Sequence, residues 1–353
     1  MKRWISLLCA CACILAVLAA GCGAPAPGVQ GAASGSGAAG AASQPGPDMP
    51  AASQPAAQPL SRPVRLGALR GPTAMGMVRL MQDAETGASA GRYEFQISGA
   101  ADELVPLLIK GELDAAALPA NLAATLAAKA GLQVAAVNTL GVLYVVATGP
   151  GIGSFEDLRG KTVLSTGKGT TPEYVLGYLM EQNGIGPDEI TVEYKSEAAE
   201  VLAALGQGEG DAAVLPQPYV AAAQQKLSVR VVLDLTEEWE KASPDSALVT
   251  GVLAVRREFA QQYPEALRQL LAEYEQSVGW VAANPAEAAP LIESYGITPS
   301  AAIAEQALPA CNIVWLSGAE MKQKLSGYLA VLYGQDPASV GGSLPGDDFY
   351  YGA

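Results

Sequence analysis

Apolar positions along the chain follow two periods, and each period predicts one kind of element. Between residues 64 and 138, short apolar or alternating runs predict strands, and apolar positions at helical spacing predict helices. Gly71-Pro72 and Gly111 end two of these elements, since glycine and proline interrupt regular structure. The predicted strands are 64–69, 93–98, 115–118 and 134–137, and the predicted helices follow Thr73 and span 102–110 and 122–129.

The same order of elements recurs 97 residues later. The clearest match pairs residues 111–119, GELDAAALP, with residues 208–216, GEGDAAVLP. A repeat of this length is larger than one supersecondary unit, so it predicts two similar lobes and not a solenoid. The second copy should hold strands at 162–165, 190–194, 212–215 and 229–233, and helices at 170–182, 197–206 and 219–226.

Strands that alternate with helices predict an α/β fold, in which each lobe is a mainly parallel sheet flanked by helices. Two further apolar runs, 141–146 and 251–256, resemble each other and are interpreted as two hinge strands that join the lobes. Residues 264–333 read as helices divided by prolines and Gly318, and residues 341–353 read as loop. The predicted lobe 1 comprises residues 62–146 plus 251–353, and lobe 2 comprises residues 147–250.

The first 61 residues predict export and a tether. Lys2 and Arg3 precede an apolar run too short to span a membrane comfortably, and residues 18–22, LAAGC, end it. This ending resembles a lipoprotein signal peptide, residues 1–21, with lipid attached to Cys22; the alternative is an ordinary cleaved signal peptide. Residues 22–61 are mostly Ala, Gly, Ser, Pro and Gln with almost no charge, which predicts a disordered linker.

The composition narrows the chemistry. The chain has no histidine, which excludes serine–histidine and cysteine–histidine nucleophile pairs and histidine metal sites. Without Lys2 and Arg3, 19 basic residues face 35 acidic ones, a net charge of −16, which argues against binding to nucleic acid. Only Cys311 remains once the signal is removed and Cys22 carries lipid, so no intramolecular disulfide is expected. We expect neither a metal nor a cofactor.

Four loops are candidate ligand contacts, because each follows a predicted strand and precedes a helix. Ligands of open α/β sheets bind at the carboxyl ends of strands, where helix N-termini present unpaired N–H groups. Arg70 and Lys168 are the basic residues of these loops, and either could meet a negative or electron-rich ligand group; surface solvation is the alternative. The loops are 70–73 and 119–121 in lobe 1, and 167–171 and 216–219 in lobe 2.

The same loops have a purely structural interpretation. Residues 170–173, TTPE, fit a capping box with proline in the first turn, so Thr170 could serve only its own helix. The spacing of Gly167 and Gly169 fits neither a dinucleotide fingerprint nor a phosphate-binding loop. Four aromatic side chains could stack on a ligand ring or belong to the core: Tyr144, Tyr174, Tyr219 and Trp239.

Residues 154–161, SFEDLRGK, open the second lobe and carry a family resemblance. With the export signal and the duplicated lobes, the chain resembles a solute-binding lipoprotein of a bacterial ABC importer. The branch it resembles contains nitrate-, taurine- and aliphatic-sulfonate-binding proteins and those that bind pyrimidine precursors of thiamine. The resemblance covers residues 62–335 and implies a type II periplasmic-binding-protein fold that closes around one small molecule. It also implies ligand-facing positions at Thr73, Asn121, Tyr144, Thr170, Thr171 and Gln217.

The expected function follows from this resemblance. The chain would be a monomeric, lipid-anchored, extracytoplasmic substrate-binding component that captures a polar or anionic solute, such as a sulfonate, nitrate or a pyrimidine-like compound. Its partners would be an ABC permease in the membrane and a cytoplasmic ATPase. A ligand-sensing receptor subunit for a membrane signalling protein is the alternative. The lipid anchor and the absent histidine disfavour an enzyme on this fold.

Overall fold

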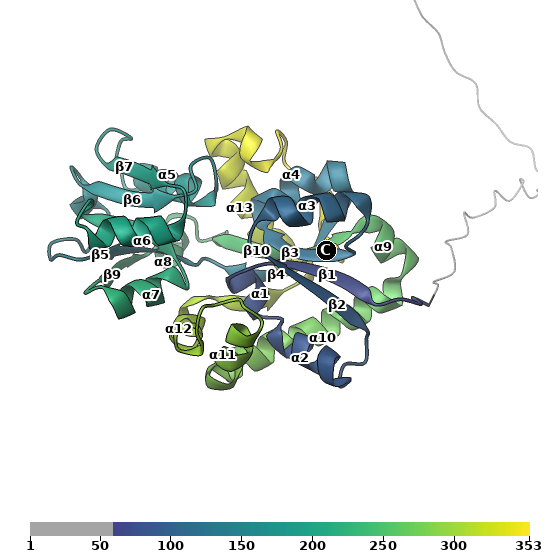
Figure 1. The fold of residues 1–353 in the computed structure, drawn as a ribbon. Helices are drawn as coiled ribbons and strands as arrows, with labels where there is room; N and C mark the ends of the chain where they lie inside the picture. The colour runs from purple at the N-terminus through teal and green to yellow at the C-terminus, as the bar shows by residue number, and fades with distance from the viewer. Residues whose placement is uncertain (1–58) are drawn as a thin grey trace, which may run out of the picture. The chain divides into compact units, whose positions relative to one another are not determined.

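The computed structural model describes residues 59–353 and shows two α/β lobes. The predicted signal peptide, Cys22 and all but the last residues of the predicted linker lie outside the described residues. Lobe 1 is built around a six-stranded sheet and lobe 2 around a five-stranded sheet (Figure 1). Among the helices of residues 59–353, none is both long and apolar enough to cross a membrane.

The two sheets share one strand order. The lobe 1 sheet runs β11-β4-β10-β3-β1-β2, and the lobe 2 sheet runs β9-β5-β8-β6-β7 in the same direction, without a counterpart of β11. In lobe 1, β1 pairs in parallel with β2 and β3, and in lobe 2 the equivalent strand β6 pairs in parallel with β7 and β8. The fold class predicted from the duplicated pattern is therefore confirmed. The strands of lobe 1 are β1 (Val64–Leu69), β2 (Tyr93–Ser98), β3 (Ala115–Pro119), β4 (Leu132–Leu140), β10 (Val249–Arg256) and β11 (Ile313–Leu316), and those of lobe 2 are β5 (Leu143–Ala147), β6 (Thr162–Thr166), β7 (Thr191–Lys195), β8 (Ala212–Pro216) and β9 (Arg230–Asp234).

The two lobes exchange one strand each. β5 follows β4 directly in the chain but pairs antiparallel with β8 and β9 of lobe 2. β10 follows lobe 2 in the chain but pairs antiparallel with β3 and β4 of lobe 1. The runs interpreted as hinge strands are thus sheet strands, and the chain crosses between the lobes just before each of them. Because β5 belongs to the lobe 2 sheet, the sheet pairing places residues 143–146 in lobe 2, whereas the sequence pattern places them in lobe 1.

Helices cover both faces of each sheet. In lobe 1, α3, α4 and α13 pack on one face, and α1, α2 and α10 pack on the other (Figure 1). In lobe 2, α5 and α8 pack on one face, and α6 and α7 on the other. The helices are α1 (Pro72–Met75), α2 (Val78–Thr86), α3 (Ala101–Lys110), α4 (Ala120–Ala130), α5 (Thr171–Gln182), α6 (Ala198–Gly206), α7 (Tyr219–Lys226), α8 (Leu235–Ala242), α9 (Arg257–Gln262), α10 (Pro264–Ala283), α11 (Pro285–Ser294), α12 (Ala301–Ala307) and α13 (Gly318–Gln335), with short 3-10 turns at Glu156–Leu158, Leu308–Ala310, Pro337–Val340 and Asp347–Phe349.

The periodicity predicts helices throughout residues 264–333, and this is wrong at β11. Residues Ile313–Leu316 pair antiparallel with β4 at the edge of the lobe 1 sheet. A run of four apolar residues is too short for its period to distinguish a strand from a buried helix. The helix predicted after Thr73 is also two helices, since α1 ends at Met75 and α2 begins at Val78.

The repeated Gly-Glu-x-Asp sequence has the same structural role in both lobes. The Asp114 N–H donates to the Arg65 carbonyl at 2.9 Å, and the Asp114 carboxylate accepts the Arg65 N–H at 2.9 Å. Asp211 exchanges the same two hydrogen bonds with Thr162, at 2.9 and 2.8 Å. Asp114 therefore connects the start of β3 to β1, and Asp211 connects the start of β8 to β6.

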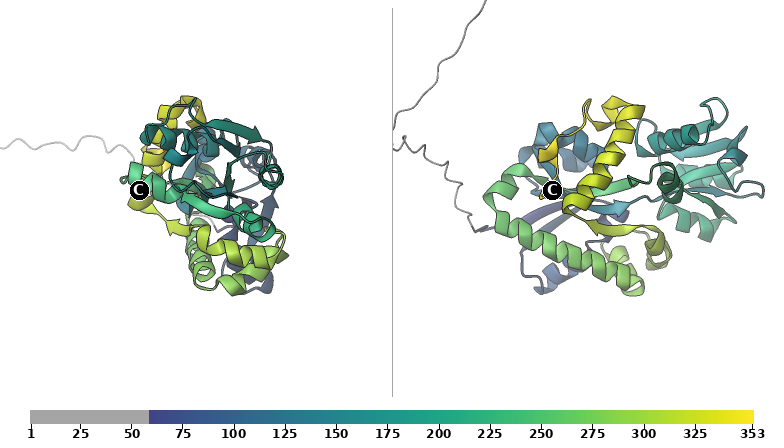
Figure 2. Two further views of the ribbon diagram at one scale, coloured as in Figure 1. Left: turned by 90° about the vertical axis from the view of Figure 1, so that its left-hand side faces the viewer. Right: turned by 180° about the vertical axis from the view of Figure 1, so that it is seen from behind.

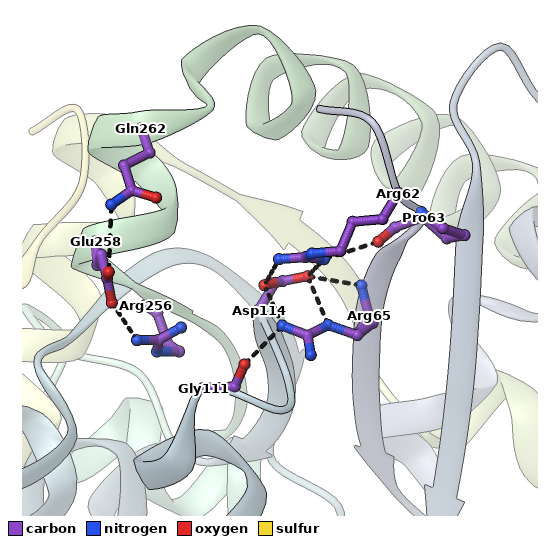
Figure 3. A network of polar contacts seen from close by, with 8 residues as sticks. All are labelled: Arg62, Pro63, Arg65, Gly111, Asp114, Arg256, Glu258 and Gln262. Atoms are coloured by element: carbon purple, nitrogen blue, oxygen red, sulfur yellow. Dashed lines mark hydrogen bonds and ion pairs between the residues drawn. The ribbon is translucent and has the colours of Figure 1, made fainter. Parts of the chain in front are cut away.

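The two aspartates differ in their surroundings. The Asp114 side chain is 1% exposed and pairs with the guanidinium groups of Arg62 at 2.5 Å and Arg65 at 3.0 Å (Figure 3). The Asp211 side chain is 46% exposed, and the Lys161 amine lies 4.0 Å away. The lobe 1 aspartate is thus part of a buried charge network, and the lobe 2 aspartate is solvated.

Helix α13 joins the two lobes. It packs on α4, β4 and β10 of lobe 1 and on α5 of lobe 2 (yellow in Figure 2, right). At its end the Tyr174 hydroxyl of α5 donates to the Asp336 carboxylate at 3.0 Å, and Gln335 donates to Glu181 of α5 at 3.0 Å. One hydrophobic cluster therefore runs through both lobes without interruption.

Candidate functional site

All four predicted loops lie at the sheet edge where the chain crosses between the lobes. In lobe 1, Pro119 at the end of β3 pairs with Gly251, close to the start of β10. In lobe 2, Pro216 at the end of β8 pairs with Leu143, the first residue of β5. Because β1 is parallel to β3 and β6 is parallel to β8, the carboxyl ends of all four strands lie at the crossover edges. This placement agrees with the general position of ligands in α/β sheets.

The first loop of lobe 1 fixes Thr73 and leaves Arg70 in solvent. The buried Thr73 hydroxyl donates to the Leu69 carbonyl at 2.8 Å, so it closes its own turn. Arg70 is exposed and forms no ion pair in the part of the chain that the structure describes. Of the two predicted ligand contacts Arg70 and Thr73, only Arg70 therefore has a side chain that is not engaged within the loop.

Behind Thr73 lies a buried polar group that the sequence pattern does not single out. Asn138 on β4 donates to the Thr73 carbonyl at 3.0 Å and to the Tyr274 hydroxyl at 2.9 Å. The Tyr274 hydroxyl in turn donates to the Thr73 carbonyl at 3.3 Å. Asn138 and Tyr274 thus hold the backbone of the loop from below. A signal for Asn138 is present in the sequence, as a polar residue within the long apolar strand 132–140.

Gly251 allows this arrangement by its lack of a side chain. A Cβ at residue 251 would lie 2.6 Å from Thr73 Cγ2 and 2.7 Å from Asn138 Oδ1. Both distances are shorter than any ordinary contact. The start of β10 can therefore lie against Thr73 and Asn138 only with glycine at this position.

The first loop of lobe 2 contains three predicted ligand contacts, which differ in their hydrogen bonding. Lys168 is exposed, and its amine lies 6.0 Å from the centre of the Tyr194 ring. The Thr170 hydroxyl donates to the Gly167 carbonyl at 2.6 Å. The N–H of Thr171, the first residue of α5, has no backbone hydrogen-bond partner among residues 59–353.

Residues 170–173 do not form the capping box that their sequence predicts. Thr170 occupies the N-cap position, but its side chain caps no N–H of α5. The Glu173 carboxylate accepts the Gly169 N–H, one residue earlier than a capping box requires. The acid in the first turn of α5 is therefore engaged by the loop before the helix.

Gln217 and Tyr144 are both buried and both committed to contacts within the protein. The Gln217 N–H donates to the Val142 carbonyl at 3.0 Å, and its side-chain oxygen accepts the Ala221 N–H at 3.3 Å. The Tyr144 hydroxyl donates to the Ala310 carbonyl at 2.8 Å, which links β5 of lobe 2 to the segment after α12 in lobe 1. Burial raises the pKa of Tyr144, and the Asp234 carboxylate adds to this, so the hydroxyl stays a donor.

Asn121 lies at the start of α4, half-buried. Its side-chain nitrogen is 3.5 Å from the Ser339 carbonyl, the outer limit for a hydrogen bond. This amide is held weakly and could turn toward another acceptor.

The first crossover is held by Asn312. The Asn312 side chain donates to the Gly141 carbonyl at 2.6 Å, and its own carbonyl accepts the Leu140 N–H at 3.0 Å. Asn312 adopts a left-handed backbone, with φ of 45°, which asparagine tolerates better than most residues. Residues far apart in the sequence thus fix the segment between the lobes.

The charges around the site favour an anion. Arg70 and Lys168 are the cations of the four loops, and no carboxylate pairs with either within residues 59–353. The four loops contain no acid, and Glu173 in the first turn of α5 already accepts the Gly169 N–H. Among residues 59–353, no group of three or more Asp, Glu or Cys side chains is placed so that it could bind a metal ion.

Two cavities lie outside the predicted loops. One of about 280 Å³ is lined by residues of α10, α11 and the segment 308–314, including Asn312. The other, of about 410 Å³, lies at the opposite end of lobe 1, between β4, α9 and the C-terminal residues. None of the eight predicted ligand residues lines either cavity.

Comparisons with known proteins give a family model and a fold. A family model described as NMT1/THI5 like matches residues 94–288. An ABC transporter structure from Parabacteroides distasonis is 23% identical with a TM-score of 0.70, and the match covers 82% of this chain and 98% of that one. The periplasmic aliphatic sulphonate binding protein SsuA from Escherichia coli is 19% identical with a TM-score of 0.65, over 82% and 96% of the two chains. At these identities the likeness shows the fold.

A sequence relative is also known. A candidate binding protein from Brucella abortus (strain 2308) is 25% identical over 153 residues, which make up 43% of this chain and 46% of that protein. The chain thus spans about half the length of the curated relatives it matches.

Proposed function

The chain belongs to the NMT1/THI5-like family, and from this membership we propose that it is the substrate-binding component of an ABC importer. The proposed role is solute binding, and no catalysis is part of it. In this proposal the chain acts as an extracytoplasmic monomer that binds one small solute between its lobes. It delivers the solute to a membrane permease driven by a cytoplasmic ATPase.

The anchor belongs to the same proposal. Residues 1–21 would direct export, lipid on Cys22 would hold the protein at a membrane surface, and residues 22–61 would serve as the tether. Support comes from the LAAGC sequence at residues 18–22 and from the small, uncharged residues that follow it.

The observation that carries the proposal is the meeting of the four strand ends at the crossover edges. These ends place the N-termini of α4 and α5 beside the crossovers, and unpaired N–H groups there attract negative charge. With Arg70 and Lys168 unpaired and Glu173 occupied, we propose that the solute is anionic, of the sulfonate or nitrate kind.

The test is a thermal-shift screen of the mature chain against methanesulfonate, taurine, nitrate and a hydroxymethyl pyrimidine. A ligand at one hundred times its Kd stabilises the folded state by about 2.7 kcal/mol. We expect one of the anions to raise Tm by several degrees above a sodium chloride control of equal ionic strength. If every compound matches the chloride control, the proposal loses its basis.

Removing the two free cations should weaken binding without weakening the fold. Arg70→Ala and Lys168→Ala each remove a charge that has no partner in the protein, so the Tm of the ligand-free chain should stay within a degree. Where one of them contacts the anion, its loss should lower affinity about tenfold, or about 1.4 kcal/mol. Calorimetric titration with the anion found in the screen measures this.

Lys110→Ala is the matched control. Lys110 is exposed in the last turn of α3, next to Gly111, which lies against Arg256 at the far end of β10. An equal loss of affinity in Lys110→Ala would mean that the net charge of the protein attracts the anion, and that neither loop cation contacts it.

A further inference from the structure

The cavity at the far end of lobe 1 is lined by a buried amide that has no hydrogen bond. This cavity, of about 410 Å³, lies at the start of β4, away from the crossover edges, and small-molecule sites in proteins span about 300–1,000 Å³. Gln133 lines it and is only 8% exposed, yet its side-chain amide forms no hydrogen bond within residues 59–353. A buried amide is unfavourable without a partner, so this one calls for a group in the cavity.

Arg257 reaches the same cavity from the end of β10. Gln133 lies opposite Val255 in the antiparallel pair of β4 and β10, and two positions farther along each strand the Arg257 N–H donates to the Gly131 carbonyl at 2.8 Å. The side chains of Gln133 and Arg257 therefore start from neighbouring positions, and both line the cavity. The Arg257 Nε is buried and has no hydrogen-bond partner among residues 59–353. Two polar groups at this cavity thus lack an acceptor within the protein.

The C-terminal segment supplies an acid and two aromatic rings to this cavity. The Arg257 guanidinium donates to the Asp348 carboxylate at 2.6 Å and to the Asp348 carbonyl at 3.3 Å. The Asp348 side chain is mostly exposed, so its carboxylate remains accessible. Tyr350 and Tyr351 line the cavity as well, and the Tyr351 N–H donates to the Val134 carbonyl of β4 at 2.9 Å, which holds the segment in place. The cavity therefore presents one cation and one anion beside an unpaired amide.

These charges favour a zwitterion over a simple ion. A simple carboxylate would pair with Arg257 but would also meet the Asp348 carboxylate, and a simple amine would meet the Arg257 guanidinium. A zwitterion carries both charges a few bonds apart, so its carboxylate can accept from Arg257 while its ammonium pairs with Asp348. Arg257 can keep its bond to Asp348, because a guanidinium has more N–H donors than this pair uses.

We propose that the cavity is a second ligand site, in which the carboxylate of a free α-amino acid accepts hydrogen bonds from Gln133 and Arg257 and its ammonium pairs with Asp348. The side chain of the amino acid would lie against the tyrosine rings. This inference goes beyond the proposed function, since none of these residues belongs to the four loops and lobe 1 alone forms the cavity.

The first test is a thermal-shift measurement of the mature chain with glycine, leucine and glutamine. We expect one of these amino acids to raise Tm, because it binds the folded state alone. Its N-acetyl derivative, which has no ammonium group, and its amide, which has no carboxylate, should leave Tm unchanged at equal concentration. A response to none of the three amino acids, or an equal response to the N-acetyl derivative, would overturn the proposal.

Gln133→Leu removes the amide and nearly keeps the volume of the side chain. Because the amide bonds to nothing in the protein, the ligand-free variant should have a Tm equal to or above that of the wild type. Calorimetric titration with the responding amino acid should show an affinity about tenfold lower, since a hydrogen bond to a charged group is lost. An unchanged affinity would contradict the assigned role of Gln133.

Gln262→Leu is the matched control, and Asp348→Asn tests the ammonium partner. Gln262 lies at the end of α9, donates to Glu258 at 3.2 Å and does not line the cavity, so its loss should leave the affinity unchanged. Asp348→Asn should weaken binding of the amino acid and allow acetate to bind, because the competing carboxylate is gone. If Asp348→Asn binds the amino acid as the wild type does, Asp348 does not contact the ammonium group and the zwitterion is the wrong ligand class.

Competition separates this site from the proposed function. The anion found in the screen should not displace the amino acid, since the two would bind at opposite ends of lobe 1. Displacement would place both ligands in one site, and the second site would not exist. If the chain binds an anion but no amino acid, only the second site fails; if it binds an amino acid but no anion, only the proposed function loses its basis.

Discussion

Replacing Asp114 with alanine will destabilise the folded chain by about 3 kcal/mol, because it leaves two guanidinium groups facing each other without a counter-charge. The Asp114 carboxylate accepts hydrogen bonds from Arg62 and Arg65 and from the Arg65 N–H, and it is almost fully buried. The loss also removes the bond that ties β3 to β1. Urea or guanidinium unfolding at pH 7 measures the change in free energy.

The pH dependence of this effect has a defined direction. Burial by itself raises the pKa of Asp114, but the hydrogen bonds from Arg62 and Arg65 outweigh it and hold the pKa below the usual value. A carboxyl with a lowered pKa stabilises the fold above its unfolded pKa of about 3.9 and loses this contribution as the pH falls through the lower folded pKa. The difference between wild type and Asp114→Ala should therefore be constant from pH 5 to 7 and shrink below about pH 4.

Asp211→Ala is the matched control for this variant. Asp211 stands at the same position of the repeat and ties β8 to β6 through Thr162, but its carboxylate is half-exposed. A solvated pair of this kind contributes about 0–1 kcal/mol, so the variant should unfold near the wild-type midpoint. Equal losses in the two variants would show that the strand connection, and not the buried charge network, sets the cost.

The sequence repeat predicts most of the architecture because it is a local signal that occurs twice. Residues 111–119 and 208–216 contain the same turn, acid and small-residue strand, and they form β3 and β8 in equivalent places of the two sheets. Strand ends then define the loops, and parallel pairing brings Arg70, Thr73, Lys168 and Thr171 to the crossover edges. These steps need only the order of elements.

The remaining features depend on contacts between distant parts of the chain. β11 is a strand because the edge of β4 is open to it, and a run of four residues carries no period of its own. The exchange of β5 and β10 between the lobes follows from sheet pairing, which two similar apolar runs do not specify. Tyr328 lies in a helix of ordinary composition, and its contact with Trp239 of α8 results from the packing of α13 across both lobes.

The arrangement beneath the site suggests how fold and binding are coupled. Thr73 is held by its own turn and, from below, by Asn138 and Tyr274, so its loop is rigid before any ligand arrives. The lobe 1 side of the site is thus preorganised.

Gly251→Val will test the rigid side, and we expect a loss of about 3 kcal/mol, at the upper end for overpacking of a filled core. The new side chain would meet Thr73 Cγ2 and Asn138 Oδ1, and neither can retreat, because both residues are buried and hydrogen-bonded. Displacement of Thr73 should also weaken anion binding in the fraction that still folds. Denaturant unfolding and calorimetric titration measure the two effects.

Gly279→Val supplies the comparison, since a Cβ at residue 279 of α10 meets no atom within 4 Å. Glycine in an exposed helix is about 1 kcal/mol less favourable than alanine and valine only about 0.6, so this variant should be neutral or slightly stabilised. If Gly251→Val instead keeps the wild-type unfolding midpoint, β10 can shift away from β4 and β3 at the crossover. The hydrogen-bonded group of Thr73, Asn138 and Tyr274 would then not be rigid, which would contradict the prediction.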